Sequence, residues 1–385
     1  MKKILLFLVL SLLVSCAKRY SGSINGRKIW KGRIKLVGDV VVERRAHLTI
    51  MPGSVISYAR KSKSQVRYIR EEASGPFNIL QDDRIEILVA GSLIAAGSAE
   101  KPVIFMKSDS AGGLVFLSKD ASKLSHVKID GVPAAIRLYG ENRPEISGCL
   151  IQDSSVAGIG LWDMSGGKMV STTFSNCRHA IGVSDFASPE VSSCSILFSK
   201  MAGIFCEGNS STVVSNCFIT GNNVGVAGGD ISKLNLLRNK ITGNGAAISL
   251  WVKSSAEISE NLITGNVTGV LIQDESKANI VSNTMEANGS AVSSVNAGKT
   301  EIKNNLFVNN NFAVILRDAS RSQILGNEIN SGSGVKISEV SEATVRDNTF
   351  TDCEEAIRMM NRAEAFITNN KMSGVKKKII DERVK

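Results

Sequence analysis

An asparagine recurs at a nearly fixed interval through the second half of the chain. The steps between its successive members are 23, 22, 22, 22, 22, 21 and 22 residues. A period this strict is typical of a solenoid, in which each repeat forms one coil stacked on the next. The members of this column are Asn216, Asn239, Asn261, Asn283, Asn305, Asn327, Asn348 and Asn370.

Apolar residues follow the same period, three residues before each asparagine, two residues after it, and again about nine residues further on. Three short apolar strands per repeat, separated by Gly, Asn, Asp and Ser turns, exclude helical repeats. The Leu-x-x-Leu-x-Leu frame of leucine-rich repeats is also missing. The first residue of the third strand forms a column of eleven: Ile136, Ile159, Ile181, Ile204, Val226, Ile248, Val270, Val292, Val314, Val335 and Ile357.

The predicted fold class is therefore all-β, a single-stranded right-handed parallel β-helix with three short strands in each coil of about 22 residues. The asparagine column is explained by tolerance of the left-handed backbone conformation at a tight turn, where stacked amides can hydrogen-bond along the axis. Toward the N-terminus the matching positions are Cys149, Thr172 and Cys194.

Over about residues 100–371 this pattern resembles the parallel β-helix repeat superfamily of carbohydrate-binding proteins and sugar hydrolases, which has the pectin-lyase-like fold. Upstream, WKGRIKLVGDVVV from Trp30, LTIMPGSVI from Leu48 and ILVAGSLIAAGSAEKPVIF from Ile87 resemble the opening coils of bacterial β-helix surface proteins. The resemblance implies the fold and says little about activity, because one fold hosts many functions.

The N-terminus reads as an export signal. Lys2 and Lys3 precede an apolar stretch of eleven residues, 4–14, which is too short to span a bilayer. The stretch ends in Leu-Val-Ser-Cys, which resembles a bacterial lipobox and implies that Cys16 becomes the lipidated first residue. Ala17 and Lys18 follow without an Asp, which by analogy favours the outer membrane of the cell envelope.

Composition and pattern divide the chain into five expected segments. They are a signal peptide (1–15), the lipidated Cys16 with a polar tether (16–28), an N-terminal cap and first coils (29–102) with a basic insertion (59–84), regular coils (103–371), and a basic C-terminal cap or tail (372–385).

The chain carries a formal net charge of +10, and removal of Lys2 and Lys3 with the signal leaves +8. Basic residues in the insertion and in the tail could bind polyanionic glycans or lipid headgroups. The interpretation that we favour is that they cap the open ends of the rod against edge-to-edge stacking. No reader motif for nucleic acid interleaves with this charge, so a nucleic-acid partner is not expected.

Six cysteines remain after Cys16. Cys149, Cys194 and Cys206 fall in inward columns. Cys177 and Cys353 fall in a second turn column that is otherwise filled by Asn244, Asn266, Asn288 and Asn310. No CxxC spacing suggests a metal site, so buried thiols are expected, although export permits a disulfide.

Two polar clusters lie on the expected outward face of the third strand, where the resemblance places the sites of pectate lyases and polygalacturonases. In the first, aromatic rings could stack on sugars beside carboxylates spaced one or two coils apart, close to glycosidase separations. Its members are Tyr139, Trp162, Asp163, Asp185, Glu207 and Asp230. Asp is also a favoured turn residue in its own right, which is the alternative reading.

The second cluster consists of Arg317, Asp318, Lys336, Glu339 and Arg358. Its Lys and Arg resemble the base and the neutraliser of β-helical polysaccharide lyases, which would call for Ca²⁺. A solvated charged face is the alternative. No other cofactor is implied.

Known catalytic signatures are absent from the sequence. None of the three histidines falls on the outward positions considered, and the Asp-Pro-His-Glu motif of alginate epimerases and the motif set of polygalacturonases are missing. The accessory proteins of nitrous-oxide reductase share the string Asn-x-Ile-Thr-Gly-Asn found at 239–244, but a copper role would want more His or Met ligands.

The sequence therefore predicts a lipid-anchored envelope β-helix that presents an extended surface to a polysaccharide or another envelope polyanion, without catalysis. A polysaccharide lyase or glycoside hydrolase, and a structural scaffold for envelope proteins, are the alternatives.

Overall fold

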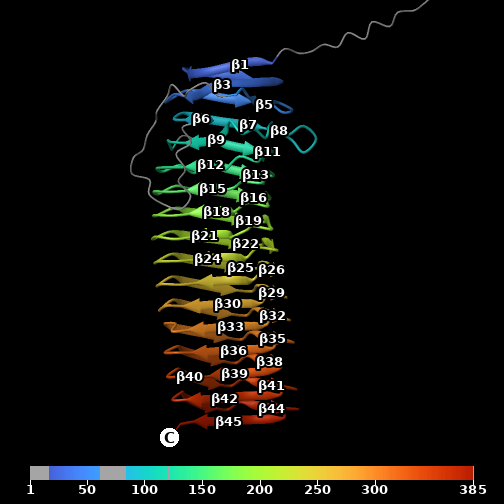
Figure 1. The fold of residues 1–385 in the computed structure, drawn as a ribbon, viewed down its shortest axis with the longest axis vertical. Coiled ribbons are helices and arrows are strands. Elements are labelled where there is room, and N and C mark those ends of the chain that lie inside the picture. Colours follow the sequence, from blue (N-terminus) through green and yellow to red (C-terminus); the bar gives the residue numbers. More distant parts are fainter. Residues whose placement is uncertain (1–16, 61–83, 120, 385) are drawn as a thin grey trace, which may run out of the picture.

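The computed structural model describes residues 17–60, 84–119 and 121–384, and every regular element in them is a β-strand. The strands wind into one straight rod of stacked coils with β1 (Lys18–Ile24) at one end and β45 (Lys377–Arg383) at the other (Figure 1). The predicted signal peptide, Cys16 and most of the insertion at 59–84 lie outside the described residues. Within the described ranges no helix is long and apolar enough to cross a membrane.

One side of the rod is a 15-stranded parallel sheet in which each strand pairs with its equivalent in the next coil. Its strands are β2 (Arg27–Trp30), β4 (His47–Ile50), β7 (Ser92–Ala96), β10 (Lys123–Ser125), β13 (Glu145–Ser147), β16 (Gly166–Val170), β19 (Ser188–Ser192), β22 (Ser211–Ser215), β25 (Lys233–Leu237), β28 (Ser255–Ser259), β31 (Lys277–Val281), β34 (Lys299–Lys303), β37 (Arg321–Leu325), β40 (Glu342–Arg346) and β43 (Glu364–Thr368).

The other strands form two rows that β3 (Arg33–Val42) joins at the N-terminal end. The short-strand row is β5 (Val55–Tyr58), β8 (Val103–Phe105), β11 (Val127–Asp130), β14 (Leu150–Gln152), β17 (Thr173–Ser175), β20 (Ser195–Leu197), β23 (Phe218–Thr220), β26 (Lys240–Thr242), β29 (Leu262–Thr264), β32 (Thr284–Glu286), β35 (Leu306–Val308), β38 (Glu328–Asn330), β41 (Thr349–Thr351) and β44 (Lys371–Ser373). The long-strand row is β6 (Ile85–Val89), β9 (Ala111–Phe116), β12 (Ala134–Leu138), β15 (Ala157–Leu161), β18 (His179–Val183), β21 (Ala202–Cys206), β24 (Val224–Gly228), β27 (Ala246–Leu250), β30 (Thr268–Gln273), β33 (Ser290–Val295), β36 (Phe312–Arg317), β39 (Ser333–Ile337), β42 (Glu355–Asn361) and β45.

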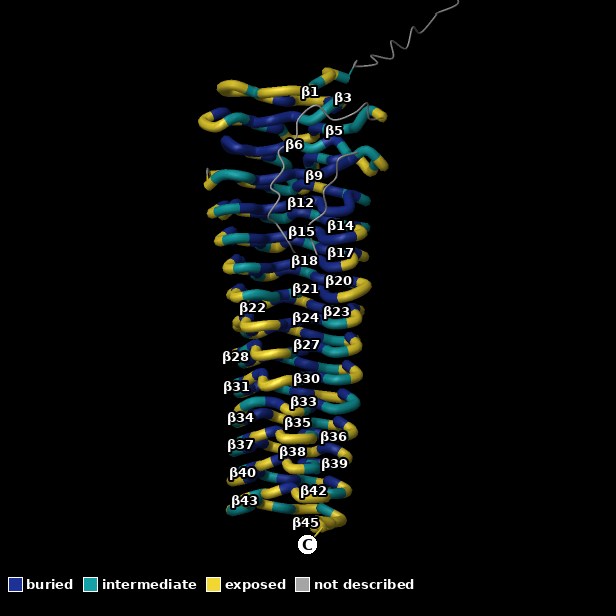
Figure 2. The backbone as a smooth tube through the Cα atoms, turned by 60° about the vertical axis from the view of Figure 1, so that its left-hand side comes forward, coloured by how far each residue is buried: buried dark blue, intermediate teal, exposed yellow. Residues whose placement is uncertain are grey.

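This arrangement confirms the predicted fold class. Each coil contributes one strand to each side, and fifteen coils at a spacing of about 4.8 Å give a rod roughly 70 Å long. Apolar side chains point into the rod from all three sides and form one continuous core from Trp30 to Ala363. Buried positions run along the rod from Trp30 to Ala363, whereas the residues of the two end strands are half-buried or exposed (Figure 2).

The corners of the coils share a left-handed backbone conformation. At most corners one residue takes a positive φ, as at Asp185 (φ 56°), Arg238 (φ 53°) and Asn309 (φ 53°). This left-handed residue turns the chain sharply from one strand into the next, and Gly, Asn and Asp tolerate it best. The turn composition of the sequence therefore follows from the geometry of the corner.

An internal asparagine ladder runs along the corner that follows the 15-stranded sheet. The backbone N–H and the Nδ2 of Asn239 donate to Oδ1 of Asn261 at 2.8 and 3.0 Å, and the same pattern continues coil by coil to Asn370. The position one coil before Asn239 is Cys217, whose N–H donates to Oδ1 of Asn239 at 2.9 Å.

Two details of the predicted ladder are wrong. Asn216 is not a member, because it is exposed and takes the left-handed conformation (φ 53°) one residue before the ladder position. The left-handed conformation is therefore not the reason for the column. In the later coils the preceding residue takes it, as Glu260 does (φ 55°), while the ladder asparagine points inward and hydrogen-bonds.

A second ladder occupies the corner between the short-strand and long-strand rows. Asn222 donates to Asn244, and the chain of amide contacts continues to Asn310 and then to Ser331. Cys177 and Cys353 are the corresponding residues in earlier and later coils, and their thiols donate to backbone carbonyls. The six cysteines after Cys16 are buried and free, as the inward columns predict.

Both ends of the described chain are more ordered than their composition suggested. Lys18–Ile24, expected within a polar tether, forms β1 and pairs with β3, because Tyr20 and Ile24 pack against the core. At the other end Lys377–Arg383, expected in a cap or tail, pairs with β42 and completes a last coil.

Candidate functional site

The corner after the long-strand row holds three of the predicted carboxylates. Asp163, Asp185 and Asp230 each have φ between 55° and 57°. Their carboxylates accept backbone N–H groups of the preceding coil: Asp163 accepts from Gly140 at 2.7 Å, Asp185 from Asp163 at 3.0 Å, and Asp230 from Gly208 at 3.0 Å. This geometry supports the turn-residue explanation, because each carboxylate satisfies a backbone donor that the corner would otherwise leave open.

The two aromatic residues of the first cluster are buried, which contradicts the expected exposed stacking surface. Tyr139 and Trp162 are 8% and 1% exposed, and their rings stack with centroids 4.9 Å apart. Trp162 folds back over Gly160, where a Cβ would lie 2.4 Å from the indole ring. The strand alternation placed the two side chains on the correct face, but a glycine and a neighbouring ring let them pack down onto it.

Glu207 differs from the three aspartates of this cluster, because its side chain is not used to satisfy a backbone N–H at the corner. Its side chain is half-buried, and the Ser184 hydroxyl donates to it at 3.1 Å. Burial raises the pKa of Glu207 above its ordinary value, the hydrogen bond from Ser184 opposes that rise, and the charges of Asp230 and Asp185 add to it. A carboxyl group with a raised pKa can hold a proton nearer to neutral pH, as a general acid does.

Three further side chains lie on the same face and were missed by sequence reasoning. His179 begins β18, meets the ring of Phe205 at 5.3 Å, and has its pKa lowered by burial to about 4. Phe205 in turn meets Trp251 at 5.7 Å. The predicted outward positions lie in the second half of each long strand, whereas His179 is the first residue of its strand.

An ion pair sits on this face nearer to the N-terminal end. Arg137 on β12 contacts Glu86 on β6, and the two side chains are 6% and 16% exposed. Neither residue belonged to a predicted cluster. The sequence signal was an Arg at an outward position of a column that continues with Gly160 and Gly182.

The structure divides the second predicted cluster into two groups. Lys336 and Arg358 are register partners on β39 and β42 and line a hollow of about 280 Å³. The Nε of Arg358 donates to Glu355 at 2.8 Å, and its Nη1 donates to Glu382 at 2.9 Å. The hydrogen bond from Arg358 lowers the pKa of Glu355, so the guanidinium of the lyase-like pair is already neutralised by carboxylates.

The other group lies at the corner. Asp318 and Glu339 are left-handed turn residues with φ of 60° and 57°, and the N–H of Asp318 donates to Glu339 at 3.4 Å. Arg317 is exposed beside them. These three residues follow the same corner pattern as the aspartates of the first cluster, and the solvated-face alternative fits them.

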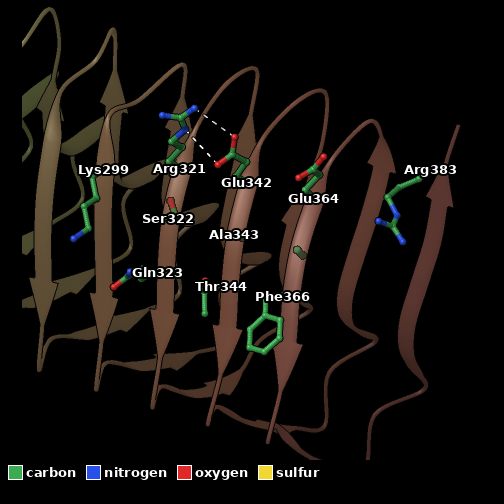
Figure 3. A pocket seen from close by; sticks show the side chains of 11 residues that line it. Lys299, Arg321, Ser322, Gln323, Glu342, Ala343, Thr344, Glu364, Phe366 and Arg383 are labelled. Carbon is green, nitrogen blue, oxygen red and sulfur yellow. Dashed lines mark hydrogen bonds and ion pairs between the residues drawn. The ribbon is translucent and has the colours of Figure 1, made fainter. Parts of the chain in front are cut away.

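A larger hollow, of about 630 Å³, lies on the outer face of the 15-stranded sheet near its C-terminal end (Figure 3). We call it the Phe366 hollow. Phe366 on β43 is 65% exposed, and it shares a column with Thr344 on β40 and Gln323 on β37. Both predicted clusters lie along the long-strand row, so neither includes this hollow.

Charged side chains form the second row of the Phe366 hollow. Arg321 contacts Glu342 at 3.4 Å, and Glu364 is the register partner of Glu342 in the next strand. Lys299 and Arg383 lie at the two sides (Figure 3). The hollow thus combines one exposed aromatic ring with amide, hydroxyl, carboxylate and guanidinium groups, the composition of a site for a polar ligand with an apolar face.

A bound metal ion finds little support among these residues. A Ca²⁺ site needs several carboxylate or carbonyl oxygens around one point. Across the described ranges, no group of three or more His, Cys, Asp or Glu side chains is placed to hold a metal. The corner aspartates, moreover, each accept a backbone N–H.

Two family models match parts of the chain. The model of the periplasmic copper-binding protein NosD matches residues 118–300, and the model of the right-handed β-helix region matches residues 246–381. No curated protein matches the sequence.

Solved structures match almost the whole chain at low identity. A variant of the periplasmic alginate epimerase AlgG is 12% identical over 89% of this chain and 78% of its own, with a TM-score of 0.50. The A-module of the mannuronan C-5 epimerase AlgE6 from Azotobacter vinelandii is 12% identical over 88% and 91%, with a TM-score of 0.39. The surface protein and adhesin PfbA of Streptococcus pneumoniae is 11% identical over 93% and 92%, with a TM-score of 0.30. At 12% identity the likeness to AlgG establishes the fold alone.

Proposed function

This chain is a right-handed parallel β-helix repeat protein, and we propose that it is a lipid-anchored envelope protein that binds a polysaccharide in the Phe366 hollow. The anchor is Cys16 at the N-terminal end, and the hollow lies near the opposite end of the rod. In this arrangement the rod carries its binding site roughly 60 Å away from the membrane.

The exposed ring of Phe366 is the observation that carries the proposal. An aromatic ring left 65% open to water costs hydrophobic free energy, which a ligand recovers when it covers the ring. The apolar face of a sugar ring is such a ligand, and its hydroxyl groups can bond to Gln323, Thr344 and the carboxylates of Glu342 and Glu364. Because these side chains follow parallel strands, they are repeated at a regular spacing that suits an extended chain.

The envelope location is supported by the leader and by the comparisons. The short apolar stretch 4–14 ends in a lipobox-like Leu-Val-Ser-Cys, and the sequence after Cys16 favours the outer membrane. The NosD model and the AlgG structure are both described as periplasmic proteins, and AlgG is an alginate epimerase, which agrees with a polysaccharide partner.

A glycan array on the protein, followed by titration of any hit, tests the binding proposal. Stacking on an aromatic ring is worth about 1–3 kcal/mol in the comparable case of nucleic-acid bases, so Phe366→Ala should weaken binding roughly tenfold or more. The matched control is Phe186→Ala, because Phe186 is equally exposed (63%) but lies at a corner of the other face. Equal affinities of the wild type and Phe366→Ala would overturn the proposed site.

The anchor has its own test. Cys16→Ala should abolish incorporation of labelled palmitate in cells, because the thiol is the acceptor of the diacylglyceryl group. Unchanged labelling in that variant would refute lipidation at Cys16 and would leave the glycan proposal standing.

Glu207 favours catalysis as a second candidate function. Its raised pKa and its hydrogen bond from Ser184 are features of a general acid in a glycosidase or lyase. Product analysis on each glycan hit decides between the two functions. Turnover that Glu207→Gln abolishes would identify an enzyme, whereas binding without products would identify a binding protein.

A further inference from the structure

We propose that the N-terminal coil is a membrane-facing basic collar that binds anionic lipid headgroups and holds the rod upright on the bilayer. The proposal rests on the anchoring of the chain at Cys16 and is independent of the glycan site. Nine cations form this basic collar. Its nine members are Lys18, Arg19, Arg27, Lys28, Lys31, Arg33, Lys35, Arg44 and Arg45.

The basic collar holds most of the positive charge of the mature chain. Residues 17–45 contain nine cations and two anions, Asp39 and Glu43, for a net charge of +7. The whole chain carries +10, of which Lys2 and Lys3 in the leader contribute two, so the 340 residues from 46 onward carry a net charge of only +1. Most of the net positive charge therefore lies at the N-terminal end of the rod.

The cations surround the coil instead of gathering on one side. Lys18 and Arg19 lie on β1 and Lys35 on β3, whereas Arg27 and Lys28 begin β2 on the 15-stranded sheet. Lys31 lies at the next corner, Arg33 begins β3, and Arg44 and Arg45 lie at the corner before β4. All nine are exposed.

These charges are not balanced within the described part of the protein. None of the nine forms an ion pair with another described residue, whereas elsewhere on the rod pairs such as Lys123–Glu145 and Lys168–Glu190 link cations to carboxylates of the next coil. Glu43 is occupied by a hydrogen bond from Ser23, and Asp39 accepts the N–H of Glu86. An external anionic surface is the partner that nine unpaired cations would attract.

The anchor at Cys16 lies next to the basic collar in the sequence, so we infer that the anionic surface is a membrane. Lys18 begins β1 only two residues after Cys16, so lipid chains on Cys16 would bring the terminal coil within roughly 7 Å of the headgroups. The same coil also offers an apolar group to an interface, because Ile29 is 66% exposed. Half-buried Tyr20 lies beside it, stacked on the buried Trp30 at 4.8 Å, and the ammonium of Lys28 lies over the Tyr20 ring.

A vesicle-binding experiment without the lipid anchor tests the collar by itself. All described elements lie after residue 16, so the chain from Ala17 onward keeps the whole described fold. This protein is mixed with vesicles of phosphatidylethanolamine that contain phosphatidylglycerol, or with neutral vesicles of phosphatidylcholine, and the bound fraction is measured by sedimentation. We expect binding to the anionic vesicles, weakening as salt rises.

The collar variant carries Arg27→Gln, Lys31→Gln and Arg44→Gln, and its matched control carries Lys371→Gln, Lys376→Gln and Lys378→Gln at the opposite end. The two variants lose the same charge. Three headgroup contacts together correspond to a weakening of roughly 100-fold for the collar variant, against less than about threefold for the control.

Equal weakening of the two variants would overturn the proposal, because binding would then follow net charge alone. Equal binding to neutral vesicles, or no binding to anionic vesicles, would also overturn it. Competition by soluble dextran sulfate as strong as that by vesicles would instead assign the collar to soluble polyanions. Because this assay uses neither lipidation nor a glycan, its failure is distinct from failure of the proposed function.

Discussion

The asparagine ladder makes a specific prediction about Asn283, near the middle of the rod. Its Oδ1 accepts the backbone N–H and the Nδ2 of Asn261 at 2.9 and 3.0 Å. Its own Nδ2 donates to the carbonyls of Ile258 and Val281 at 2.8 and 3.1 Å and to Oδ1 of Asn305 at 3.0 Å. Leu has the same number of side-chain heavy atoms and the same branching but neither donors nor acceptors, so Asn283→Leu breaks all five contacts.

The magnitude follows from the groups that the substitution leaves without partners. The buried N–H of Asn261 loses its acceptor, Oδ1 of Asn283. The carbonyl of Ile258 loses its donor, Nδ2 of Asn283. An orphaned buried polar group costs about 1–3 kcal/mol, so Asn283→Leu should lower the local stability by about 2–4 kcal/mol. The ladder also tolerates sulfur at Cys217, which accepts the N–H of Cys194 at 3.4 Å, so Asn283→Cys should cost less than Asn283→Leu.

Native-state amide hydrogen exchange is the appropriate assay, because a long solenoid can open in segments and a single melting curve averages over them. The exchange free energy of the Asn261 N–H should fall most. Asn279→Leu is the matched control, since Asn279 lies on β31 of the same coil, faces outward and donates its side-chain amide to Glu257 at 2.8 Å. It should cost less than about 1 kcal/mol. Equal losses in the two variants would refute the assignment of Asn283 to an inward, stabilising ladder.

Two further predictions concern the long-strand row. Trp162→Ala should destabilise the protein by about 3–5 kcal/mol in denaturant unfolding, because the ring is 1% exposed and stacks on Tyr139, and a loss below about 1 kcal/mol would contradict its burial. The pKa of Glu207 is raised in the folded state, so Glu207 contributes to stability below about pH 4.3, and this contribution is lost as the pH rises through the raised pKa. The unfolding free energy should therefore fall between pH 4 and 7 in the wild type. Glu207→Gln should remove this part of the fall. The pKa of His179 is lowered to about 4, so its contribution to the unfolding free energy is present above about pH 6.5 and is lost as the pH falls toward 4. His179→Gln should reduce this fall in stability. An unchanged pH profile of stability in either variant would contradict the corresponding pKa shift.

The coil could be predicted from the sequence because its period is strict, and the exceptions have local causes. Asn occurs at two adjacent positions of the same corner, once as a left-handed turn residue at Asn216 and once as an inward ladder residue at Asn239. The two positions cannot be told apart from the amino-acid sequence, which explains why the predicted ladder position in this coil was displaced by one residue. The first strand was missed because a terminal coil has few inward positions, and only Tyr20 and Ile24 mark β1 as part of the core.

The site was harder to predict because strand alternation gives direction without giving exposure. Trp162 points outward and is still buried, since Gly160 leaves room for the ring to lie down and Tyr139 covers it. Phe366 also points outward, but its register neighbour Thr344 is small and β43 is the last strand of the sheet, so the ring stays open. Which of two outward rings is available to a ligand depends on the residues of adjacent coils, and these become visible only once the register is known.

The most direct test of a glycan-binding rod is the footprint of a bound glycan, measured as the change in backbone amide exchange when a hit from the array is added at saturation. We expect protection on β37, β40 and β43, at Gln323, Thr344 and Phe366, and no change in β15 to β27. Protection confined to the long-strand row around Glu207 would contradict the account and place the site on the opposite face.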